Sequence, residues 1–298
     1  MNYIAVDWGT SNFRALSVRD GVVIKSVLAS CGVGSCQRAE LPGILQQQLR
    51  RLDEAYDEQL PVLLCGMIGS NLGIADAGYL AMPLSFSQLL GKGMPLPGIL
   101  PNPLTLRPGI CDSQVNEICR GEEIQLAGAL VHSTANTFAA VGTHSKWLRV
   151  DRLAQQVTGL HTLMTGELYH LLLTCSVVGK GLPAQSFSLA AFQAGVETAQ
   201  RVMREETELV TELFRCRGRY ILGAMEKEDA ASWLSGLLTG YEITRAHPGG
   251  DQTVCFIGSD TLLPHYQQAC EILHCRYELL SAERAIVTGL NEVFRYGE

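Results

Sequence analysis

The chain has 298 residues, of which 47% are hydrophobic and 18% are charged, and its formal net charge is −7. This composition excludes a disordered chain, and the length predicts two domains. The net charge is negative and the sequence has no cluster of lysine and arginine, so the basic patch that nucleic-acid-binding proteins use is missing from the sequence.

The sequence shows neither a membrane-spanning segment nor a basic leader. No apolar run reaches the roughly 18 residues of a spanning helix, and the first residues form no basic leader. We therefore expect a cytoplasmic protein without a membrane partner. The ten cysteines show no C-x-x-C pair, which favours reduced thiols over a zinc site or a disulfide framework.

The first thirty residues predict three antiparallel strands. Residues 3–8 and 14–18 are apolar runs on either side of a Gly-Thr-Ser-Asn turn, and Asp20-Gly21 is a typical hairpin turn before residues 22–24. A helical spacing of leucines over residues 41–52 and a buried strand over residues 62–65 follow. This order indicates an α/β sheet with a mixed edge.

The middle of the chain predicts a loop and then a helix. Residues 91–110 are rich in proline and glycine, so we expect at most a short strand around residues 104–106. Residues 122–131 have the apolar spacing of a helix. Further helices are expected at residues 167–178, 190–216, 229–241, 262–273 and 283–294, with a buried strand at residues 253–258.

An internal sequence repeat suggests that a domain has been duplicated. Residues 139–148 repeat the pattern of residues 5–14: an apolar strand, Gly-Thr, small polar residues, a nearby basic residue and a second apolar strand. The two Gly-Thr pairs lie about half the chain apart, so a duplicated domain is the simplest interpretation.

Each Gly-Thr turn is a candidate phosphate site, because successive backbone N–H groups and hydroxyls in a tight turn can hold phosphate oxygens. Asp7, just before the first turn, is a candidate Mg²⁺ ligand. A single turn of this kind is usually only a hairpin. Two such turns favour phosphate binding.

Four other segments have both a structural and a functional interpretation. Arg120-Gly121-Glu122-Glu123 begins a helix, and its acids either complement the helix dipole or serve as an acid–base group. Adjacent helical residues point about 100° apart, so only one carboxylate can face a ligand, while the other is solvated or pairs with Arg120. The loop over residues 66–73 either binds a sugar through backbone donors or is a turn in which Ser70 caps a helix. Thr165 and Ser259 are likewise helix caps or ligand contacts. Gly236 and Gly240 favour close helix packing, or a helix that lines an adenine slot.

Six segments in this order resemble the 2-dehydro-3-deoxygalactonokinase family of the actin-like ATPase superfamily over nearly the whole chain. These segments are residues 66–71, 120–123, 142–147, 164–168, 234–238 and 257–259. One departure is Ile74, which stands where the resemblance leads us to expect an aromatic residue. The arrangement of Gly121, Glu122 and Glu123 is also similar to that of exopolyphosphatases, which favours Glu122 over Glu123 as the base.

The resemblance implies an α/β fold of two duplicated actin-like (ribonuclease H-like) domains, residues 1–132 on the sugar-acid side and 133–298 on the nucleotide side, with a nucleotide cleft between them. The last helix either stays with the second domain or packs back on the first. It implies a kinase that uses ATP and Mg²⁺ to phosphorylate the terminal 6-hydroxyl of 2-dehydro-3-deoxy-D-galactonate. A phosphohydrolase and a non-catalytic ATP-dependent regulator are the alternatives. Oligomeric state, including a homodimer, and the choice between galactonate-type and gluconate-type acids stay open.

The expected site residues fall into four groups. The catalytic group is Glu122, Asp7 and Arg120, and Asp7 is also the metal ligand. The expected ATP contacts are Gly9, Thr10, Ser11, Asn12, Arg14, Gly142, Thr143, His144, Ser145, Lys146, Gly258 and Ser259. The expected substrate contacts are Gly69, Ser70, Asn71, Thr165 and Glu167.

Overall fold

The computed structural model describes residues 1–91, 93–247 and 249–297. The chain forms two compact units. The first unit comprises Met1–Thr134, Leu148–Leu160 and Ala282–Glu298, and the second comprises Ala135–Trp147 and His161–Ser281.

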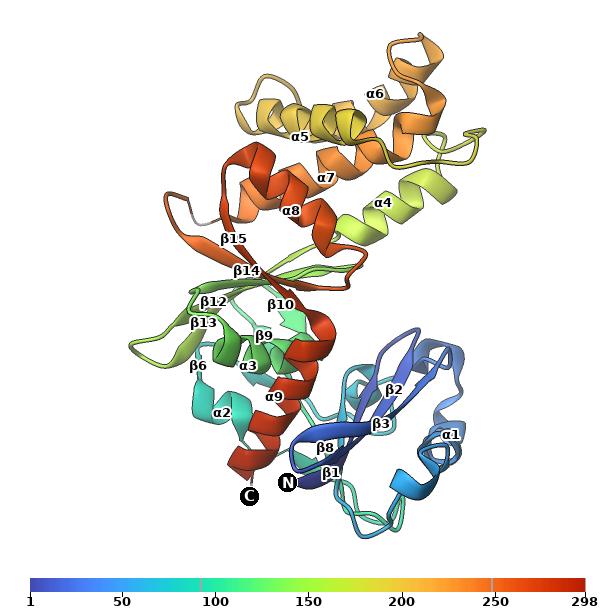
Figure 1. Ribbon diagram of the computed structural model, residues 1–298, viewed down its shortest axis with the longest axis vertical. Helices are drawn as coiled ribbons and strands as arrows, with labels where there is room; N and C mark the ends of the chain where they lie inside the picture. Colours follow the sequence, from blue (N-terminus) through green and yellow to red (C-terminus); the bar gives the residue numbers. More distant parts are fainter. Residues whose placement is uncertain (92, 248, 298) are drawn as a thin grey trace. The chain divides into compact units, whose positions relative to one another are not determined.

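The strands and the longer helices follow one another along the chain as labelled in Figure 1. In the first 134 residues they are β1 (Asn2–Trp8), β2 (Phe13–Arg19), β3 (Val22–Ala29), α1 (Leu41–Arg50), β4 (Val62–Cys65), β5 (Tyr79–Ala81), β6 (Leu84–Ser85), α2 (Phe86–Leu90), β7 (Met94–Pro95), β8 (Leu104–Leu106), β9 (Gly109–Asp112), β10 (Glu117–Cys119) and α3 (Glu122–His132). From there to the end they are β11 (Thr137–Ala140), β12 (Ser145–Asp151), β13 (Gln156–Leu163), α4 (Thr165–Thr174), α5 (Leu189–Met203), α6 (Leu209–Ile221), α7 (Ala230–Ala246), β14 (Thr253–Gly258), α8 (Leu263–Leu273), β15 (Arg276–Ser281) and α9 (Ala282–Gly297).

The sheets confirm the predicted duplication. One sheet has the order β3-β2-β1-β4-β8-β7, and another has the order β15-β14-β11-β12-β13-β6. In the first of these, β1 is antiparallel to β2 and parallel to β4. In the other, β11 is parallel to β14, which in turn is parallel to β15. The orders β3-β2-β1-β4-β8 and β13-β12-β11-β14-β15 are therefore equivalent, and the predicted α/β fold of two duplicated halves is confirmed.

The hairpin between β2 and β3 forms where the sequence predicts it. Asp20 and Gly21 both have positive φ, at 50° and 77°. This conformation is required by the tight turn that matches the twist of two antiparallel strands.

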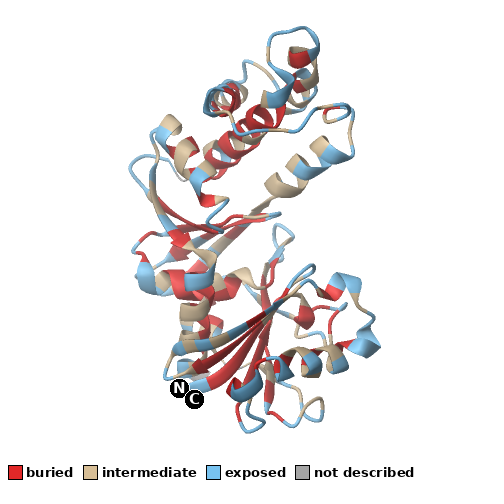
Figure 2. Cartoon of the chain, turned by 45° about the vertical axis from the view of Figure 1, so that its right-hand side comes forward, coloured by how far each residue is buried: buried red, intermediate tan, exposed pale blue. Residues whose placement is uncertain are grey.

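Both faces of the first unit's main sheet are covered, so its central strands are buried (Figure 2). On one face Trp8 and Phe13 pack with the buried leucines of α1. On the other face Tyr3 stacks on Phe294 of α9, with ring centroids 4.6 Å apart. Removing this apolar surface from water is the main stabilising contribution.

Helices α3 and α9 touch through two glycines. A Cβ on Gly128 would lie 1.9 Å from the carbonyl oxygen of Ala285, and a Cβ on Gly289 would lie 1.9 Å from that of Ile124. Any side chain here would separate the two backbones. The start of α3 therefore depends on a close contact with the last helix of the chain.

Helices α5 and α7 are in similarly close contact. A Cβ on Gly195 would lie 2.1 Å from the Trp233 carbonyl oxygen, and one on Gly236 would lie 2.0 Å from that of Phe192. Gly240 likewise faces Val196 and Ala199 of α5. These glycines serve helix packing, the first of the two interpretations of their spacing.

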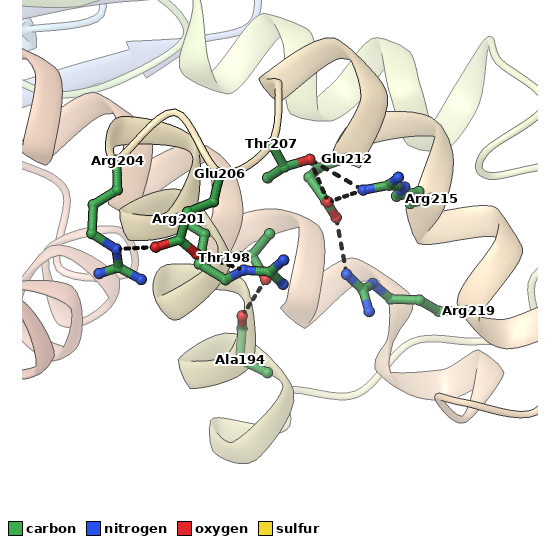
Figure 3. A network of polar contacts seen from close by, with 9 residues as sticks. All are labelled: Ala194, Thr198, Arg201, Arg204, Glu206, Thr207, Glu212, Arg215 and Arg219. Atoms are coloured by element: carbon green, nitrogen blue, oxygen red, sulfur yellow. Dashed lines mark hydrogen bonds and ion pairs between the residues drawn. The ribbon is translucent and has the colours of Figure 1, made fainter.

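The single helical segment predicted for residues 190–216 is wrong. The chain forms α5 and α6 with a break between them, where Glu205 has a φ of 61°. Figure 3 shows the contacts around this break: Glu206 pairs with Arg201 and Arg204, at 3.3 and 2.6 Å. Each helix buries apolar residues, among them Val196 of α5 and Cys216 of α6, so the spacing in the sequence does not reveal the break.

The loop predicted for residues 91–110 also needs correction. Strand β8 lies where a short strand was expected, but β7 and the beginning of β9 fall within the same segment. Two-residue strands such as β7 exist only through their pairing with a neighbour, here Met94 with Leu106. Within the described ranges, no helix is both long and apolar enough to cross a membrane.

Candidate active site

In each duplicated sheet, a Gly-Thr turn follows a strand and lies beside the end of a parallel neighbour. In the first unit, Asp7 of β1 is level with Cys65 of β4, so the turn after β1 lies beside the loop that begins at Gly66. In the second unit, Ala140 of β11 is level with Ile257 of β14, so the turn at Gly142 lies beside Gly258. Ligands bind at this edge of an α/β sheet.

The first turn presents its N–H groups outward because its carbonyls are occupied. The carbonyl oxygens of Gly9, Thr10 and Ser11 accept hydrogen bonds from the N–H groups of residues 33, 34 and 32, at 2.9–3.1 Å. Among the described residues, no protein acceptor takes the N–H of Thr10 or Ser11. Thr10, Ser11 and Asn12 are exposed. The turn can therefore donate to an anion.

Asp7 and Arg14 face each other across the strands that flank this turn. They are register partners on β1 and β2, and both are half-buried. Burial raises the pKa of the Asp7 carboxyl, and the Arg14 charge partly offsets the shift. Nη1 of Arg14 is buried without a hydrogen-bond partner in the described chain. A carboxylate oxygen and a free cationic donor thus lie beside the turn.

The loop after β4 is stabilised by hydrogen bonds within its own backbone. Gly66 has a φ of 87°, and a Cβ there would lie 2.9 Å from the Trp8 carbonyl oxygen. The N–H groups of Gly69 and Ser70 donate to the carbonyls of Gly66 and Met67, at 3.1 and 3.0 Å. These two donors therefore stabilise the loop itself, and a contact of Gly69 and Ser70 with the substrate stays a prediction.

Two further findings concern the end of this loop. Ser70 caps no helix, since its hydroxyl donates to Met67 O at 2.7 Å and accepts from the N–H of Leu72. Asn71 is exposed. Ile74, the residue expected to be aromatic, packs against the apolar core of the first unit.

Arg120 lies under the same loop. Its guanidinium donates to Gly78 O at 3.0 Å, lies 3.8 Å from Asp76 Oδ1, and sits over the Tyr79 ring. Nε and Nη1 are buried without a partner in the described chain. The expected pairing of this guanidinium with the acids that follow it does not occur. Arg120 instead donates its backbone N–H to Glu122 Oε2, at 3.0 Å.

The two acids at the start of α3 differ in environment. Glu122 is partly exposed, whereas Glu123 is 1% exposed and accepts the N–H of Gly121 at 2.6 Å. Burial first, and then the neighbouring Glu122 charge, raise the pKa of Glu123 to about 8, against the hydrogen bonds and the Arg107 charge that lower it. Glu123 Oε1 has no hydrogen-bond partner in the described chain. At neutral pH, Glu123 is therefore mostly the neutral acid, while Glu122 is the acid that a ligand can reach.

We expect the free energy of unfolding to decrease as the pH rises from about 4.5 to about 8 because of Glu123. In that interval the folded protein keeps a proton that the unfolded chain has released, so raising the pH favours unfolding. Glu123→Gln should remove this part of the slope, since an amide stays neutral. Urea unfolding of both proteins across this interval measures the difference, and equal slopes would contradict the assignment.

In the second unit, only part of the predicted phosphate turn faces outward. Thr143 and His144 are exposed, and the space around a Cβ on Gly142 is open. Ser145 is fully buried, and its hydroxyl lies 3.2 Å from Tyr266 OH, so this hydroxyl contacts the interior of the unit, and a contact of Ser145 with ATP stays a prediction. Lys146 is 9% exposed, and its ammonium donates to Thr162 Oγ1 at 3.0 Å.

The first turn of α4 is hydrogen-bonded to the turn at Gly142. The N–H of Glu167 donates to Thr143 O at 3.0 Å, and its carboxylate contacts the His144 ring at 2.5 Å. The Thr165 hydroxyl donates to the buried Glu242 of α7, and a contact of Thr165 with the substrate stays a prediction. Ser259 lies in the turn before α8, where its hydroxyl accepts the N–H of Leu262, the N-cap residue of that helix, at 3.2 Å. Its contact with a nucleotide stays a prediction.

Sequence analysis missed two charged residues that the structure brings to these regions. Arg107 is 2% exposed, and its charge acts on Glu123. Glu242 is fully buried. A glutamate inside a largely apolar helix was the available signal for Glu242, whereas Arg107 lies in a proline-rich segment without any signal.

The comparisons with known proteins agree with this geometry. The family model described as 2-keto-3-deoxy-galactonokinase matches residues 7–293. The 2-dehydro-3-deoxygalactonokinase of Escherichia coli (strain K12) is 32% identical over 295 residues, which cover 98% of this chain and 97% of that protein. A relative from Rhizobium meliloti (strain 1021), whose name carries the same activity, is 32% identical over 301 residues, which cover 98% and 96%.

A solved structure is similar as well. The crystal structure of a protein from Sinorhizobium meliloti, described as a 2-dehydro-3-deoxygalactonokinase, has a TM-score of 0.87 and 30% identity, with 98% of each chain covered. Sequence and fold therefore agree over almost the whole length. The chain belongs to the 2-keto-3-deoxy-galactonokinase family.

Proposed function

We propose that this protein is an ATP-dependent sugar-acid kinase that phosphorylates the 6-hydroxyl of 2-dehydro-3-deoxy-D-galactonate in galactonate catabolism. The observation that carries the proposal is the match to this family over nearly the full length of the chain. The two equivalent Gly-Thr turns support it, because a kinase must hold the phosphates of its nucleotide.

For the nucleotide, the outward N–H groups of Thr10 and Ser11 and the open space at Gly142 suit phosphate oxygens. Asp7 suits Mg²⁺, because its partly buried carboxylate is a hard oxygen ligand. When bound, the ion would neutralise charge on the phosphates. Arg14 adds a cationic donor beside the same turn.

For the acceptor, Glu122 would take the proton of the sugar hydroxyl. Glu123, mostly neutral beside it, adds little negative charge to the site at neutral pH. The substrate is a carboxylate and the whole chain is also acidic, so local donors must hold it. Asn71, together with the unpaired nitrogens of Arg120, provides such donors.

A coupled assay of ATP turnover against a panel of sugar acids tests the function. We expect turnover only when a 2-keto-3-deoxy acid is present. Steady ATP or polyphosphate hydrolysis without an acceptor would instead favour a phosphohydrolase, and ATP binding without turnover would favour a regulator. Faster turnover of a neutral hexose than of any sugar acid would defeat the acid-substrate assignment.

Asn71→Leu should raise the KM for the sugar acid and leave the KM for ATP nearly unchanged. The side chain is exposed, so the substitution removes a donor without disturbing the core. Leu72→Asn, at the equally exposed neighbouring position, is the matched control. An equal loss for both substrates would show that Asn71 only supports the loop.

A further inference from the structure

Glu242 joins four elements of the second unit. Its fully buried carboxylate, on α7, accepts hydrogen bonds from Trp147 Nε1 of β12 at 3.0 Å and from Tyr266 OH of α8 at 2.9 Å. It also accepts the hydroxyl of Thr165, the first residue of α4. These donors offset part of the cost of burying a carboxylate, although burial still raises the pKa of Glu242, and they fix its position.

Each of these donors adjoins the turn at Gly142. Two residues after Thr165, Glu167 binds both Thr143 O and the His144 ring. Between them, Gly166 lies so close to the turn that a Cβ there would be 2.5 Å from Gly142 O. On the other side of the turn, Trp147 lies three residues beyond His144.

Tyr266 links Glu242 to Ser145, the residue that follows the turn. Its hydroxyl, while bonded to Glu242, also lies 3.2 Å from Ser145 Oγ. The segments on both sides of the turn are thus hydrogen-bonded to the Glu242 carboxylate, α4 through Thr165 and β12 through Trp147.

We propose that Glu242 is a positioning residue: it holds Thr165 and Trp147 so that the turn at Gly142, Thr143 and His144 keeps the geometry that binds the phosphates of ATP. This role rests on the proposed function, because the turn is a phosphate site only in a nucleotide-binding protein. Glu242 acts through the turn and α4 and does not itself contact the nucleotide.

Glu212 of α6 provides a matched control in the same unit. It is 1% exposed, and it accepts hydrogen bonds from Thr207, Arg215 and Arg219, at 3.0, 2.8 and 2.9 Å (Figure 3). All three donors lie on α6 or just before it, and none adjoins the turn. A substitution of Glu212 therefore shows the effect of losing a buried glutamate alone, whereas a substitution of Glu242 also removes contacts next to the turn at Gly142.

The experiment compares Glu242→Gln with Glu212→Gln. Glu242→Gln leaves at least one buried donor without an acceptor, and Glu212→Gln removes the charge that pairs with Arg215 and Arg219. Both variants should therefore lose stability in thermal unfolding. Only Glu242→Gln should raise the dissociation constant of ATP, measured by titration calorimetry, by about 10-fold or more. Its KM for the sugar acid should stay within about twofold of the wild type.

Two variants at Thr165 keep the test decisive if Glu242→Gln fails to fold. Thr165→Val, which removes the hydroxyl, should weaken ATP binding, and Thr165→Ser, which keeps it, should restore binding to near the wild-type value. In a Glu242→Ala background, Thr165→Val should have little additional effect, because that background already lacks the acceptor of the Thr165 hydroxyl.

Equal changes in ATP affinity in Glu242→Gln and Glu212→Gln would overturn the proposal, as would unchanged affinity in Thr165→Val. A wild-type protein that does not bind ATP would overturn both the positioning role and the kinase. If the wild type binds ATP but phosphorylates no sugar acid, the proposed function fails. Weaker ATP binding by Glu242→Gln would still support the positioning role.

Discussion

Replacing Glu122 with glutamine should lower kcat about 100-fold or more, with little change in the affinity for ATP. An amide keeps the shape of the side chain but cannot take a proton from the acceptor hydroxyl. The carboxylate of Glu122 is held by the N–H of Arg120 at 3.0 Å, which fixes one of its oxygens. Steady-state kinetics with ATP and the sugar acid, together with calorimetry of ATP binding, separate the two effects.

Glu123→Gln is the matched control for this prediction, and its cost should be much smaller. At neutral pH it replaces a mostly neutral acid with a neutral amide, and the amide oxygen can still accept the N–H of Gly121. If the two variants gave the reverse result, the base would be Glu123. If neither mattered, Asp7 would become the leading candidate.

Gly142→Val should weaken ATP binding about 10-fold or more while the protein stays folded. The φ of Gly142 is not positive and no described atom lies within 4 Å of an added Cβ, so valine fits the protein itself. Its methyl groups would instead occupy the space through which phosphate oxygens approach the backbone. Calorimetric titration with ATP measures the loss.

Gly218→Val is the control for Gly142→Val, because Gly218 lies in α6 of the same unit and also has open space around it. The control should bind ATP like the wild type. Unchanged ATP affinity in a folded Gly142→Val protein would exclude the turn after β11 from the nucleotide site.

Local chemistry was sufficient to predict the framework of the fold. The Asp20-Gly21 turn, the buried run of β4 and the repeated Gly-Thr turns each have a cause within a few residues, and the structure contains all of them. The short strands β5, β6, β7, β9 and β10 were missed because each depends on its pairing with another strand. The longer strands β13 and β15 were missed as well. No periodicity reveals such pairings.

The candidate site was predicted less completely, because sequence gives residue types and not side-chain directions. Ser145 and Thr165 follow a pattern typical of ligand contacts, yet both hydroxyls point to buried partners, Tyr266 and Glu242. Glu122 and Glu123 are chemically identical in the sequence. Only the packing around α3 makes one accessible and the other neutral.

The glycine contact between α3 and α9 has a consequence for biosynthesis. Gly128 can reach its final position only after Gly289 has been synthesised, since each glycine lies against the other helix's backbone. A ribosome adds roughly 5–20 residues per second, so α3 waits several seconds or more for its partner. The acids at the start of α3 should therefore acquire their final environment only after the last helix has been synthesised.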